Sequence, residues 1–546
     1  MNCYRLFGQK SRKKENLMTG GEIVVECLKK QGVSVVFGMP GTHLNQIYAG
    51  LYKNQDSISH ILARHEGGAS LMAEGYSRVT GEVGVCLVIP GPGASNAYTG
   101  IVEAYTACSP VLLITGQHEP RYTNKDYGKM FHGLNHIAAF NPVTKLAKHV
   151  ENVKDIPEAI DEVFGALRSG RPKPVLLEIT ANALSAEAEV EIPERNDGVK
   201  MKATEQQLQQ AINLIVKSER PFIIAGKGVY HARDNGELLK FAKLIKAPVV
   251  TTGMGKGVIS EYEDLSLGGI GSSTSRNAMG ESDLVLAIGT RFTQMDTGGW
   301  SMKFSQPLIH IEADPEEINK EYTADVGIAG DAKLVLQQLI DALESPLPLP
   351  FRKEGILRSG WGDTLEKFKS EVESAESPRM IRELREILSP DATLVSDVHI
   401  AGYPARTHFK VHDPSNYLYS GILVAMGYGL PAAIGVKVAH PDRQVVAFCG
   451  DGGFMLSSPE FATLMKYNLK IVVIVVNDNA LGSVKGGQVR TLGGTIGVDL
   501  YNPDFVKYAE SFDAYGFRVN DPDDFKPTVE KALTLDAPAL VEVVRK

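Results

Sequence analysis

The sequence has little of several features that define whole classes of protein. Its five cysteines are scattered, and no two of them form a Cys-x-x-Cys pair. So sparse a set is typical of a reducing compartment and predicts a cytoplasmic protein. The aliphatic run at residues 471–476 is far too short to span a bilayer. We therefore expect no membrane segment.

The chain also has no long block of charge of one sign. Its formal net charge is −8, so binding to nucleic acid is not expected. With 43% hydrophobic and 22% charged residues, the composition is that of an ordinary globular protein. A chain of 546 residues is too long for one hydrophobic core, and about two to four domains are expected.

The first 18 residues differ from the rest of the chain. They are polar and basic, with Lys10, Arg12, Lys13 and Lys14, and they contain no apolar core of a secretory signal. We predict a disordered basic tail at residues 1–18. Met18 is an alternative start of the functional chain.

From Thr19 onward, apolar strand-like runs alternate with helix-like segments. This alternation predicts an α/β fold of three doubly wound parallel-sheet domains. The expected domains cover residues 19–185, 205–342 and 376–546, with linkers at 183–205 and 343–375. In the first domain, strands are expected at 33–37, 58–62, 83–89, 111–115 and, as the last one, 174–179. Residues 540–543 are expected to close the sheet of the third domain.

Two apolar runs near the C-terminus each end in residues that carry oxygen ligands. The run at 445–449 leads into Gly450, Asp451, Gly452 and Gly453, and a helix capped by Ser457 or Ser458 is expected after them. The run at 471–476 ends in Asn477, Asp478 and Asn479. Because both runs lack alternation, they are typical of buried parallel strands, whose carboxyl ends meet at one edge of a sheet.

The chemistry of these two strand ends suits a metal-bound phosphate. Glycines let backbone N–H groups approach a phosphate closely, and Asp451 and Asp478 are hard oxygen ligands of the kind that Mg²⁺ prefers. The Gly-Asp-Gly segment alone would suit an ordinary turn equally well. The second oxygen-rich strand end favours the metal site.

This stretch resembles the diphosphate-anchoring motif of the thiamine-diphosphate-dependent enzymes, Gly-Asp-Gly followed later by Asn-Asn. The second Asn of that motif is Asp478 here. The resemblance implies that Mg²⁺ is held by Asp451, Asp478 and the backbone carbonyl of Ala480. It assigns thiamine diphosphate to Gly41, Glu66, Met426, Gly427, Gly450, Asp451, Gly452, Gly453, Asp478, Ala480, Leu481 and Gly482.

Met426 takes its assignment from the segment that includes Gly427–Gly435. The family places a large apolar residue there, under the bent cofactor. A plain core methionine is the alternative interpretation.

A second motif, Arg64-His65-Glu66-Gly67-Gly68-Ala69, lies where a strand passes into a helix of small residues. A carboxyl group buried there is suited to proton exchange, although a helix N-cap carboxylate is the alternative from the residues alone. The segment resembles the Arg-His-Glu-x-Gly-Ala motif of the acetolactate synthase (acetohydroxyacid synthase) large-subunit branch. In that branch the Glu hydrogen-bonds a ring nitrogen of the cofactor and promotes its activation. Glu66 is therefore expected to be catalytic.

Several substrate-side positions depart from the acetolactate synthase pattern. Its Arg-Phe-Asp-Asp-Arg reads 291–295 here, so that Met295 stands in place of the arginine that binds the acceptor carboxylate. The family's Gln-Trp-Gln corresponds to residues 486–488 here, which lack the tryptophan. The family's lysine corresponds to Ala181, and its Gln-His-Gln corresponds to residues 400–402, which are Ile-Ala-Gly. Methionine cannot replace a bidentate arginine contact.

Two reactions of a pyruvate-like 2-oxo acid therefore remain open. The overall resemblance slightly favours decarboxylation followed by carboligation to a second carbonyl compound. The departures favour a non-ligating 2-oxo-acid decarboxylase or an aldehyde lyase. A non-catalytic thiamine-diphosphate-binding protein and a flavin or NAD oxidoreductase are more distant alternatives.

Three histidines are candidates for proton transfer. His43, after Pro40-Gly41-Thr42, lies where some 2-oxo-acid decarboxylases and aldehyde lyases of the superfamily carry a histidine, and His118 and His132 follow predicted strand ends or loops. Histidines near their ordinary pKa can shuttle protons, whereas a surface loop position is the alternative for each. We expect His43 and His132 to be catalytic, and His118 is a weaker candidate.

The resemblance also bears on the central domain and on assembly. Residues 247–331 resemble the domain that carries a non-redox FAD in acetolactate synthases, although no full Gly-x-Gly-x-x-Gly motif is present. FAD is therefore a candidate cofactor. Because the family binds its cofactor between the first domain of one subunit and the third domain of another, a homodimer or homotetramer is expected. The sequence does not indicate whether a small regulatory subunit binds.

Overall fold

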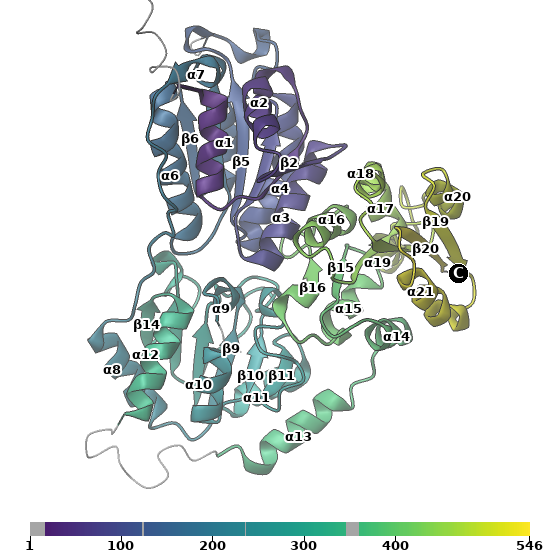
Figure 1. Cartoon of the computed structure of the whole chain (residues 1–546). Coiled ribbons are helices and arrows are strands. Elements are labelled where there is room, and N and C mark those ends of the chain that lie inside the picture. Colours follow the sequence, from purple (N-terminus) through teal and green to yellow (C-terminus); the bar gives the residue numbers. More distant parts are fainter. Residues whose placement is uncertain (1–16, 123–124, 235, 346–359, 546) are drawn as a thin grey trace, which may run out of the picture.

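The computed structural model describes residues 17–122, 125–234, 236–345 and 360–545 (Figure 1). In these ranges, three six-stranded parallel sheets follow one another along the chain, each with helices packed on its faces. The α/β class with three doubly wound domains is thus confirmed. Most of the predicted basic tail, residues 1–16, lies outside the described ranges. Met18 pairs in a short antiparallel ladder with Ala188.

The first sheet has the strand order β3-β2-β4-β5-β7-β6. Its strands are β2 (Val35–Gly38), β3 (Ser59–Leu62), β4 (Gly84–Val88), β5 (Val111–Gln117), β6 (Leu146–Val150) and β7 (Val175–Thr180). Its helices are α1 (Gly20–Lys30), α2 (Asn45–Lys53), α3 (Glu66–Thr80), α4 (Pro92–Ala107), α5 (His136–Phe140), α6 (Ile156–Arg168) and α7 (Ala181–Ser185). Helix α1 begins at a capping box between Thr19 and Glu22, as its sequence favours. All five expected strands are present, and β7 is the last in sequence.

The central sheet has the strand order β11-β10-β9-β12-β13-β14. Its strands are β9 (Pro221–Ala225), β10 (Val249–Thr251), β11 (Ser266–Gly269), β12 (Leu284–Ile288), β13 (Leu308–Glu312) and β14 (Val326–Ala329). Its helices are α8 (Glu205–Ile215), α9 (Lys227–His231), α10 (Glu237–Ile245), α11 (Ser273–Glu281) and α12 (Ala332–Glu344). Counted along the chain, this order is 3-2-1-4-5-6, which is typical of dinucleotide-binding domains.

The third sheet has the strand order β16-β15-β17-β18-β20-β19. Its strands are β15 (Thr393–Ser396), β16 (Tyr417–Tyr419), β17 (Val445–Gly450), β18 (Ile471–Asn477), β19 (Tyr515–Val519) and β20 (Ala539–Val544). Its helices are α14 (Arg379–Ile387), α15 (Gly402–His408), α16 (Gly429–Ala439), α17 (Asp451–Ser457), α18 (Phe461–Lys466), α19 (Gly482–Leu492), α20 (Phe505–Glu510) and α21 (Phe525–Leu533).

Three details of this region differ from expectation. Strand β20 lies between β18 and β19, so residues 540–543 do not close the sheet. Helix α17 begins at Asp451 itself, and Ser458 starts a separate 3₁₀ turn, so neither Ser457 nor Ser458 caps a long helix. The expected linker at 343–375 contains helix α13 (Gly362–Glu373), which follows Trp361, a residue buried against the central sheet.

Helices α3 and α16 join the first and third domains within the chain, and they lie side by side in Figure 1. Two glycines let their backbones approach. A Cβ on Gly75 would lie 2.5 Å from the carbonyl oxygen of Ala432, and a Cβ on Gly435 would lie 2.0 Å from that of Met72. Their apolar residues belong to one continuous core cluster. The two domains therefore form one packed unit along this seam.

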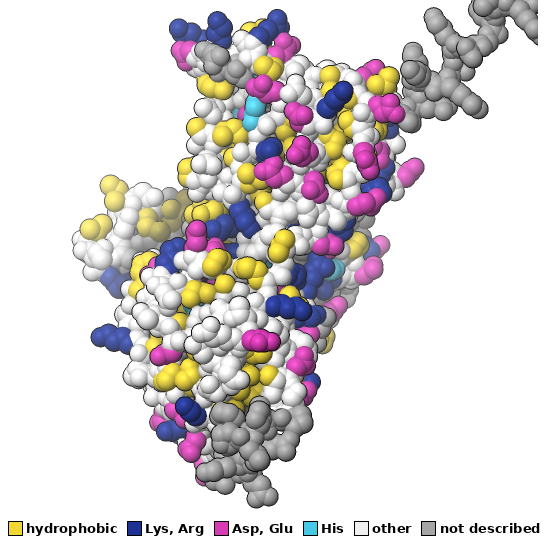
Figure 2. All heavy atoms as spheres, turned by 90° about the vertical axis from the view of Figure 1, so that its left-hand side faces the viewer, with side chains coloured by type: hydrophobic (Ala, Val, Ile, Leu, Met, Phe, Trp, Pro, Cys, Tyr) yellow, Lys and Arg dark blue, Asp and Glu magenta, His cyan; other side chains and the backbone are white. Residues whose placement is uncertain are grey.

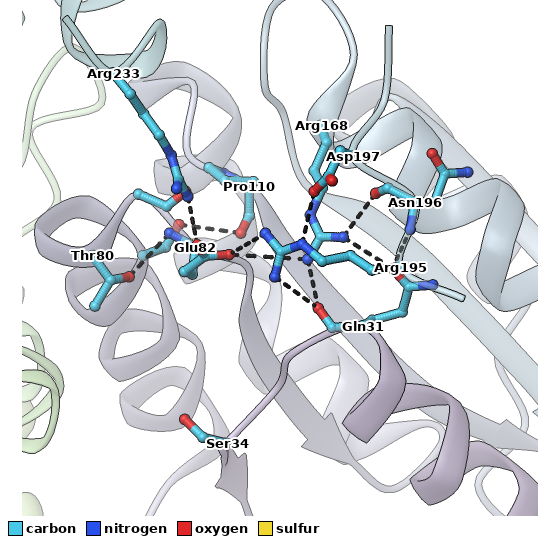
Figure 3. Close-up of polar contacts among 12 residues, drawn as sticks. Gln31, Ser34, Thr80, Glu82, Pro110, Arg168, Arg195, Asn196, Asp197 and Arg233 are labelled. Atoms are coloured by element: carbon cyan, nitrogen blue, oxygen red, sulfur yellow. Dashed lines mark hydrogen bonds and ion pairs between the residues drawn. The ribbon is translucent and has the colours of Figure 1, made fainter. Parts of the chain in front are cut away.

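A polar network centred on Glu82 connects the first domain to the segment before the central domain and to the central domain itself (Figure 3). Arg233 and Arg195 bind opposite oxygens of its carboxylate at 2.5 and 3.1 Å. Arg168 donates to the side chain of Gln31 at 2.9 Å. Burial alone would raise the pKa of Glu82, but the hydrogen bonds and charges of Arg233 and Arg195 outweigh it and lower the pKa.

The surface shown in Figure 2 mixes acidic and basic side chains over the first and central domains, and its described part has no extended area of one sign. Within the described ranges, no helix is both long and apolar enough to cross a membrane.

Candidate active site

The Gly-Asp-Gly segment leaves the carboxyl end of β17 and turns directly into α17. The carboxylate of Asp451 is buried in this turn, with 2% of the residue exposed. Its Oδ1 accepts a hydrogen bond from the N–H of Gly452 at 2.9 Å, and its Oδ2 accepts one from the Nδ2 group of Asn502 at 2.7 Å. The carboxylate is thus held by two donors at the start of a helix, with its position fixed.

The two oxygen-rich strand ends meet at one hollow of about 500 Å³. The Nδ2 group of Asn502 ties them together, because it also lies 3.1 Å from Oδ1 of Asn477 and 3.2 Å from Oδ1 of Asn479. The hollow is lined by the predicted residues Met426, Gly450, Asp451, Gly452, Gly453, Asp478, Ala480, Leu481 and Gly482. Gly427 lies behind it, with φ +85 and its N–H donated to Asp397.

The electrostatics of this hollow suit a cation. Burial raises the pKa of Asp451, and the neighbouring carboxylate of Asp478 raises it further. Two acidic groups in one hollow repel each other, and a bound cation relieves the repulsion. In the described ranges there is no group of three or more His, Cys, Asp and Glu side chains that could hold a metal. Two carboxylates and the Ala480 carbonyl still fit Mg²⁺ when phosphate oxygens complete its shell.

Glu66 is the first residue of α3, at the carboxyl edge of the first sheet. It is 8% exposed, and its Oε2 accepts a hydrogen bond from the Nδ2 group of Asn96 at 2.9 Å. The N-cap is the preceding residue, His65, whose Nδ1 accepts the N–H of Gly67 at 3.0 Å. Glu66 is therefore not the capping group that the alternative interpretation of its motif required.

The three candidate histidines lie together at the same edge of the first domain. The ring of His43 is 5.6 Å from that of His118 and 5.3 Å from that of His132, centroid to centroid. The Nδ1 atoms of His43 and His132 are buried without a hydrogen-bond partner in the described structure. Burial lowers the pKa of His43, and the neighbouring His132 and His118 lower it further. The lowered pKa favours the neutral form of His43, which suits a proton carrier.

Gly41 completes this half of the site. It lies between β2 and the turn that carries His43, and a Cβ there would lie 2.3 Å from Cγ2 of Ile89. A side chain at this position would collide with the end of β4.

Within one chain, the two halves of the predicted site are separate. The residues that line the Asp451 hollow lie between Val398 and Val484, and no residue of the first domain is among them. The first and third domains instead touch behind the hollow. There Glu460, 1% exposed, accepts hydrogen bonds from the N–H groups of Arg64 and His65 at 3.1 and 2.9 Å. Glu66 therefore does not line the hollow that contains Asp451.

Sequence reasoning missed three residues of the third-domain half. Asp397 follows β15 and accepts the N–H groups of Val398, Gly427 and Gly429 at 2.6 to 3.1 Å, which fixes the loop that carries Met426. Burial raises the pKa of Asp397 to about 6, against the effect of these hydrogen bonds. Its place at a strand end was a usable signal, because ligands gather at such ends.

The other two missed residues are Asn502 and His399. His399 lines the hollow, and neither of its ring nitrogens has a hydrogen-bond partner in the described structure. Burial lowers its pKa to about 3. Asn502 comes from an irregular segment far along the chain, where no pattern marked it.

A larger cavity of about 890 Å³ lies between the first and central domains. It opens at the carboxyl ends of β9 and β12, where the strand order of the central sheet reverses. Its charged lining residues are Arg168, Arg171, Lys200, Lys227, Arg291, Asp296, Glu312 and Asp331. Arg171 pairs with Glu312 at 2.8 Å, and Nζ of Lys227 donates to the carbonyl of Ala107 at 2.6 Å.

This cavity suits a dinucleotide in position and charge, although two usual features are missing. β10 ends in threonines without an acidic residue after them, and Lys227 stands between two glycines in the turn after β9.

Comparison with known proteins gives the class of this fold and site. Residues 18–139 match the family model of the thiamine pyrophosphate enzyme N-terminal TPP binding domain. Residues 208–339 match the central domain, and residues 401–543 match the C-terminal TPP binding domain. Relatives that are at least 30% identical along nearly the whole chain agree with these matches. The chain belongs to the thiamine pyrophosphate enzymes.

Within this class, the similar proteins are large subunits of acetolactate synthases. The chain is 35% identical to the probable acetolactate synthase large subunit of Methanocaldococcus jannaschii, over 96% of this chain and 92% of that protein. It is 31% identical to the acetolactate synthase isozyme 3 large subunit of Escherichia coli, over 95% and 92%. The resemblance stated from the motifs is thereby confirmed.

Proposed function

We propose that this chain decarboxylates a pyruvate-like 2-oxo acid and ligates the resulting two-carbon unit to a second carbonyl compound, as an acetolactate-synthase-like enzyme. The observation that carries the proposal is the full-length similarity to named acetolactate synthases. The Asp451 hollow and the buried Glu66 carboxylate support it, because both halves of a thiamine diphosphate site are present.

Each residue has a defined task in this proposal. Asp451, Asp478 and the Ala480 carbonyl would hold Mg²⁺, and the glycine turn at Gly452 and Gly453 would let the diphosphate approach the backbone. Thiamine diphosphate supplies the electron sink for decarboxylation. Glu66 holds or releases a proton at its free carboxylate oxygen, Oε1, while Asn96 keeps Oε2 in place. Met426 limits the shape of the bound cofactor from one wall of the hollow.

The reaction is tested by product analysis. The protein is incubated with pyruvate, thiamine diphosphate and Mg²⁺, and CO₂, acetolactate and acetaldehyde are quantified in one tube. Acetolactate in proportion to CO₂ supports the carboligase. Acetaldehyde in its place supports a decarboxylase and rejects carboligation of pyruvate.

The non-ligating alternative has one structural observation in its favour. The cluster of His43, His118 and His132 supplies imidazoles at the edge of the first domain, where protons would be delivered after CO₂ leaves. A His43→Gln variant separates the two reactions. Loss of acetaldehyde formation with unchanged ligation would assign His43 to protonation, whereas equal loss of both would assign it to a step they share.

We also propose that two copies of the chain complete each active site, in a homodimer or homotetramer. The separation of Glu66 from the Asp451 hollow within one chain supports this. Two inactive variants, Glu66→Gln and Asp451→Asn, should restore each other when their subunits are mixed. Random exchange in a dimer would return on the order of a quarter of the wild-type sites. Absence of recovery, with subunit exchange demonstrated, would reject a shared site.

FAD is proposed for the cavity of the central domain. The strand order and the basic lining residues support a dinucleotide there. The purified protein is denatured and the supernatant is examined for flavin absorbance. Added FAD is then titrated against the native protein by its fluorescence. Failure of both measurements would reject a flavin in this cavity.

A further inference from the structure

A second cavity adjoins the thiamine diphosphate hollow. It shares the lining residues Val398, His399 and Tyr403 with the hollow. The remaining residues of its wall are Met295, Ser396, Asp397, Gly402, Arg406, Tyr417, Tyr419, Ser420, Gly421 and Val424. Because the two spaces share a wall, a small molecule in the second cavity would lie next to the cofactor.

Arg406 is the one cationic residue on this wall within the described structure. It comes from α15, and its guanidinium lies over the ring of Tyr419, with Cζ 4.8 Å from the ring centroid. The stacked ring fixes the plane of the guanidinium but leaves its N–H groups free to donate. The side chain is 26% exposed, so a ligand can reach it.

The nearest carboxylate does not use the donors of Arg406. Asp296 lies 3.8 Å from Nη2, too far for a hydrogen bond. Its Oδ1 already accepts the N–H of Gly253 at 2.8 Å, and its Oδ2 accepts the hydroxyl of Thr293 at 2.7 Å. No hydrogen bond from the Arg406 guanidinium occurs within the ranges that the structure describes. A planar donor group is therefore available, facing a cavity beside the cofactor.

Met295 indicates a role for Arg406 in this cavity. It stands where the acetolactate synthase pattern has the arginine for the acceptor carboxylate, and it lines the same cavity as Arg406. We propose that Arg406 binds the carboxylate of the acceptor 2-oxo acid, so that α15 supplies the guanidinium that position 295 lacks. The inference rests on the proposed function, because it assumes a carboxylate acceptor.

The chemistry of the cavity favours this ligand. A guanidinium can bind both oxygens of a carboxylate at once. Val424 and the partly exposed Met295 line the cavity beside it. The cavity thus suits a small 2-oxo acid and has no comparable site for an uncharged aldehyde.

The first test compares two acceptors for one donor. With pyruvate as donor, Arg406→Met should lower ligation to a 2-oxo acid roughly 10- to 100-fold, mainly through the KM of the acceptor. Ligation to acetaldehyde should change little, and so should CO₂ release when acetaldehyde is the acceptor. Arg406→Lys should restore part of the loss, and Met295→Arg in the Arg406→Met background should restore more. Equal effects on both acceptors, or none, would overturn the assignment.

A matched control is Arg276→Met. Arg276 is an exposed arginine on α11, and its side chain is in no hydrogen bond or ion pair in the described structure. This variant should leave both ligation reactions unchanged.

A binding measurement keeps the inference separate from the proposed function. Lactate carries the carboxylate but cannot be decarboxylated in the same way, and its binding is measured by calorimetry. If the wild type consumes no 2-oxo acid yet binds lactate, and Arg406→Met does not bind it, the carboxylate site stands and the proposed function fails. If wild type and variant bind lactate equally, the Arg406 assignment is overturned whatever the enzyme converts.

Discussion

The first and third domains have the same architecture and carry different chemistry. Counted along the chain, both sheets follow the order 2-1-3-4-6-5, and the helix after the second strand, α3 in one and α16 in the other, lies on the seam between them. At the equivalent edge, the first domain presents Glu66 and three histidines, whereas the third presents two aspartates and glycine turns. In the proposed function, one fold thus supplies proton-exchanging groups in one copy and a metal–phosphate anchor in the other.

The central domain shows that this division is not a property of α/β sheets in general. Its order of 3-2-1-4-5-6 reverses between β9 and β12, and its cavity opens there instead of at a seam with an equivalent sheet. Similar layers therefore present different sets of side chains at the three sheet edges, and the differences come from strand order and from a few residues at strand ends.

We expect the largest effect on the rate from a substitution of Glu66, in the first-domain half of the site. Glu66→Gln keeps the size and the hydrogen bond to Asn96 but removes the ionisable group, so the rate should fall about 10²- to 10⁴-fold. Binding of thiamine diphosphate, followed by calorimetry, should change little. Loss of cofactor binding in this variant would show that Glu66 acts mainly as an anchor.

A substitution of Asp451, in the third-domain half of the site, should weaken cofactor binding, whereas Glu66→Gln should leave it little changed. Asp451→Asn removes one charge from the Asp451–Asp478 pair, so the affinity for Mg²⁺ and thiamine diphosphate should fall roughly 100-fold. Saturating Mg²⁺ should restore part of the rate. A variant that binds both cofactors normally but is inactive would contradict the division between the two domains.

The seam between the two copies can be tested through stability. In Gly435→Ala the added Cβ meets the backbone of Met72 at 2.0 Å, so α16 must move away from α3, at a cost of about 1–3 kcal/mol in the free energy of unfolding. Thermal unfolding measures the loss. Gly280→Ala on α11 is the control, because its Cβ meets no atom within 4 Å. Equal melting temperatures for both variants would show that the seam tolerates displacement.

The smallest effect should come from the Glu82 network, which joins the first domain to the central one. The pKa of Glu82 is lower in the folded state than in the unfolded state. Glu82 therefore stabilises the folded state above its unfolded pKa of about 4.3, and this stabilisation is lost as the pH falls through the folded pKa. Glu82→Gln should therefore lower the free energy of unfolding by about 0.2–1 kcal/mol at pH 7. It should have no effect at a pH below the folded pKa of Glu82. The exposed Glu376 is the control position. A loss that does not depend on pH would indicate packing instead of charge.

Much of the fold and of the anchoring half could be predicted because the relevant residues are adjacent in sequence. Gly450 to Gly453 and Asp478 to Gly482 each form one short segment after an uninterrupted apolar strand, and such runs are easily read. The edge strands β6, β11, β14, β16 and β19 were missed. β6 and β19 are only partly buried, and the other three are short, so they lack the long apolar signal of interior strands.

The rest of the site depends on contacts between distant segments. Asn502, Asp397 and Arg406 act through neighbours from other elements, and nothing in their local sequence reports those neighbours. Helix α13 was read as a linker because its low apolar content does not reveal that it follows the buried Trp361.

Glu460 has a consequence for an assembly of two copies. It lies nine positions after Asp451 in the chain, and it holds the N–H groups of Arg64 and His65, the two residues before Glu66. If Glu66 serves the site of one pair of domains and Asp451 that of the other, each subunit contacts both sites, and Glu460 is one of its links between them. Any effect of cofactor binding at one site on the affinity of the other must then be reciprocal at equilibrium.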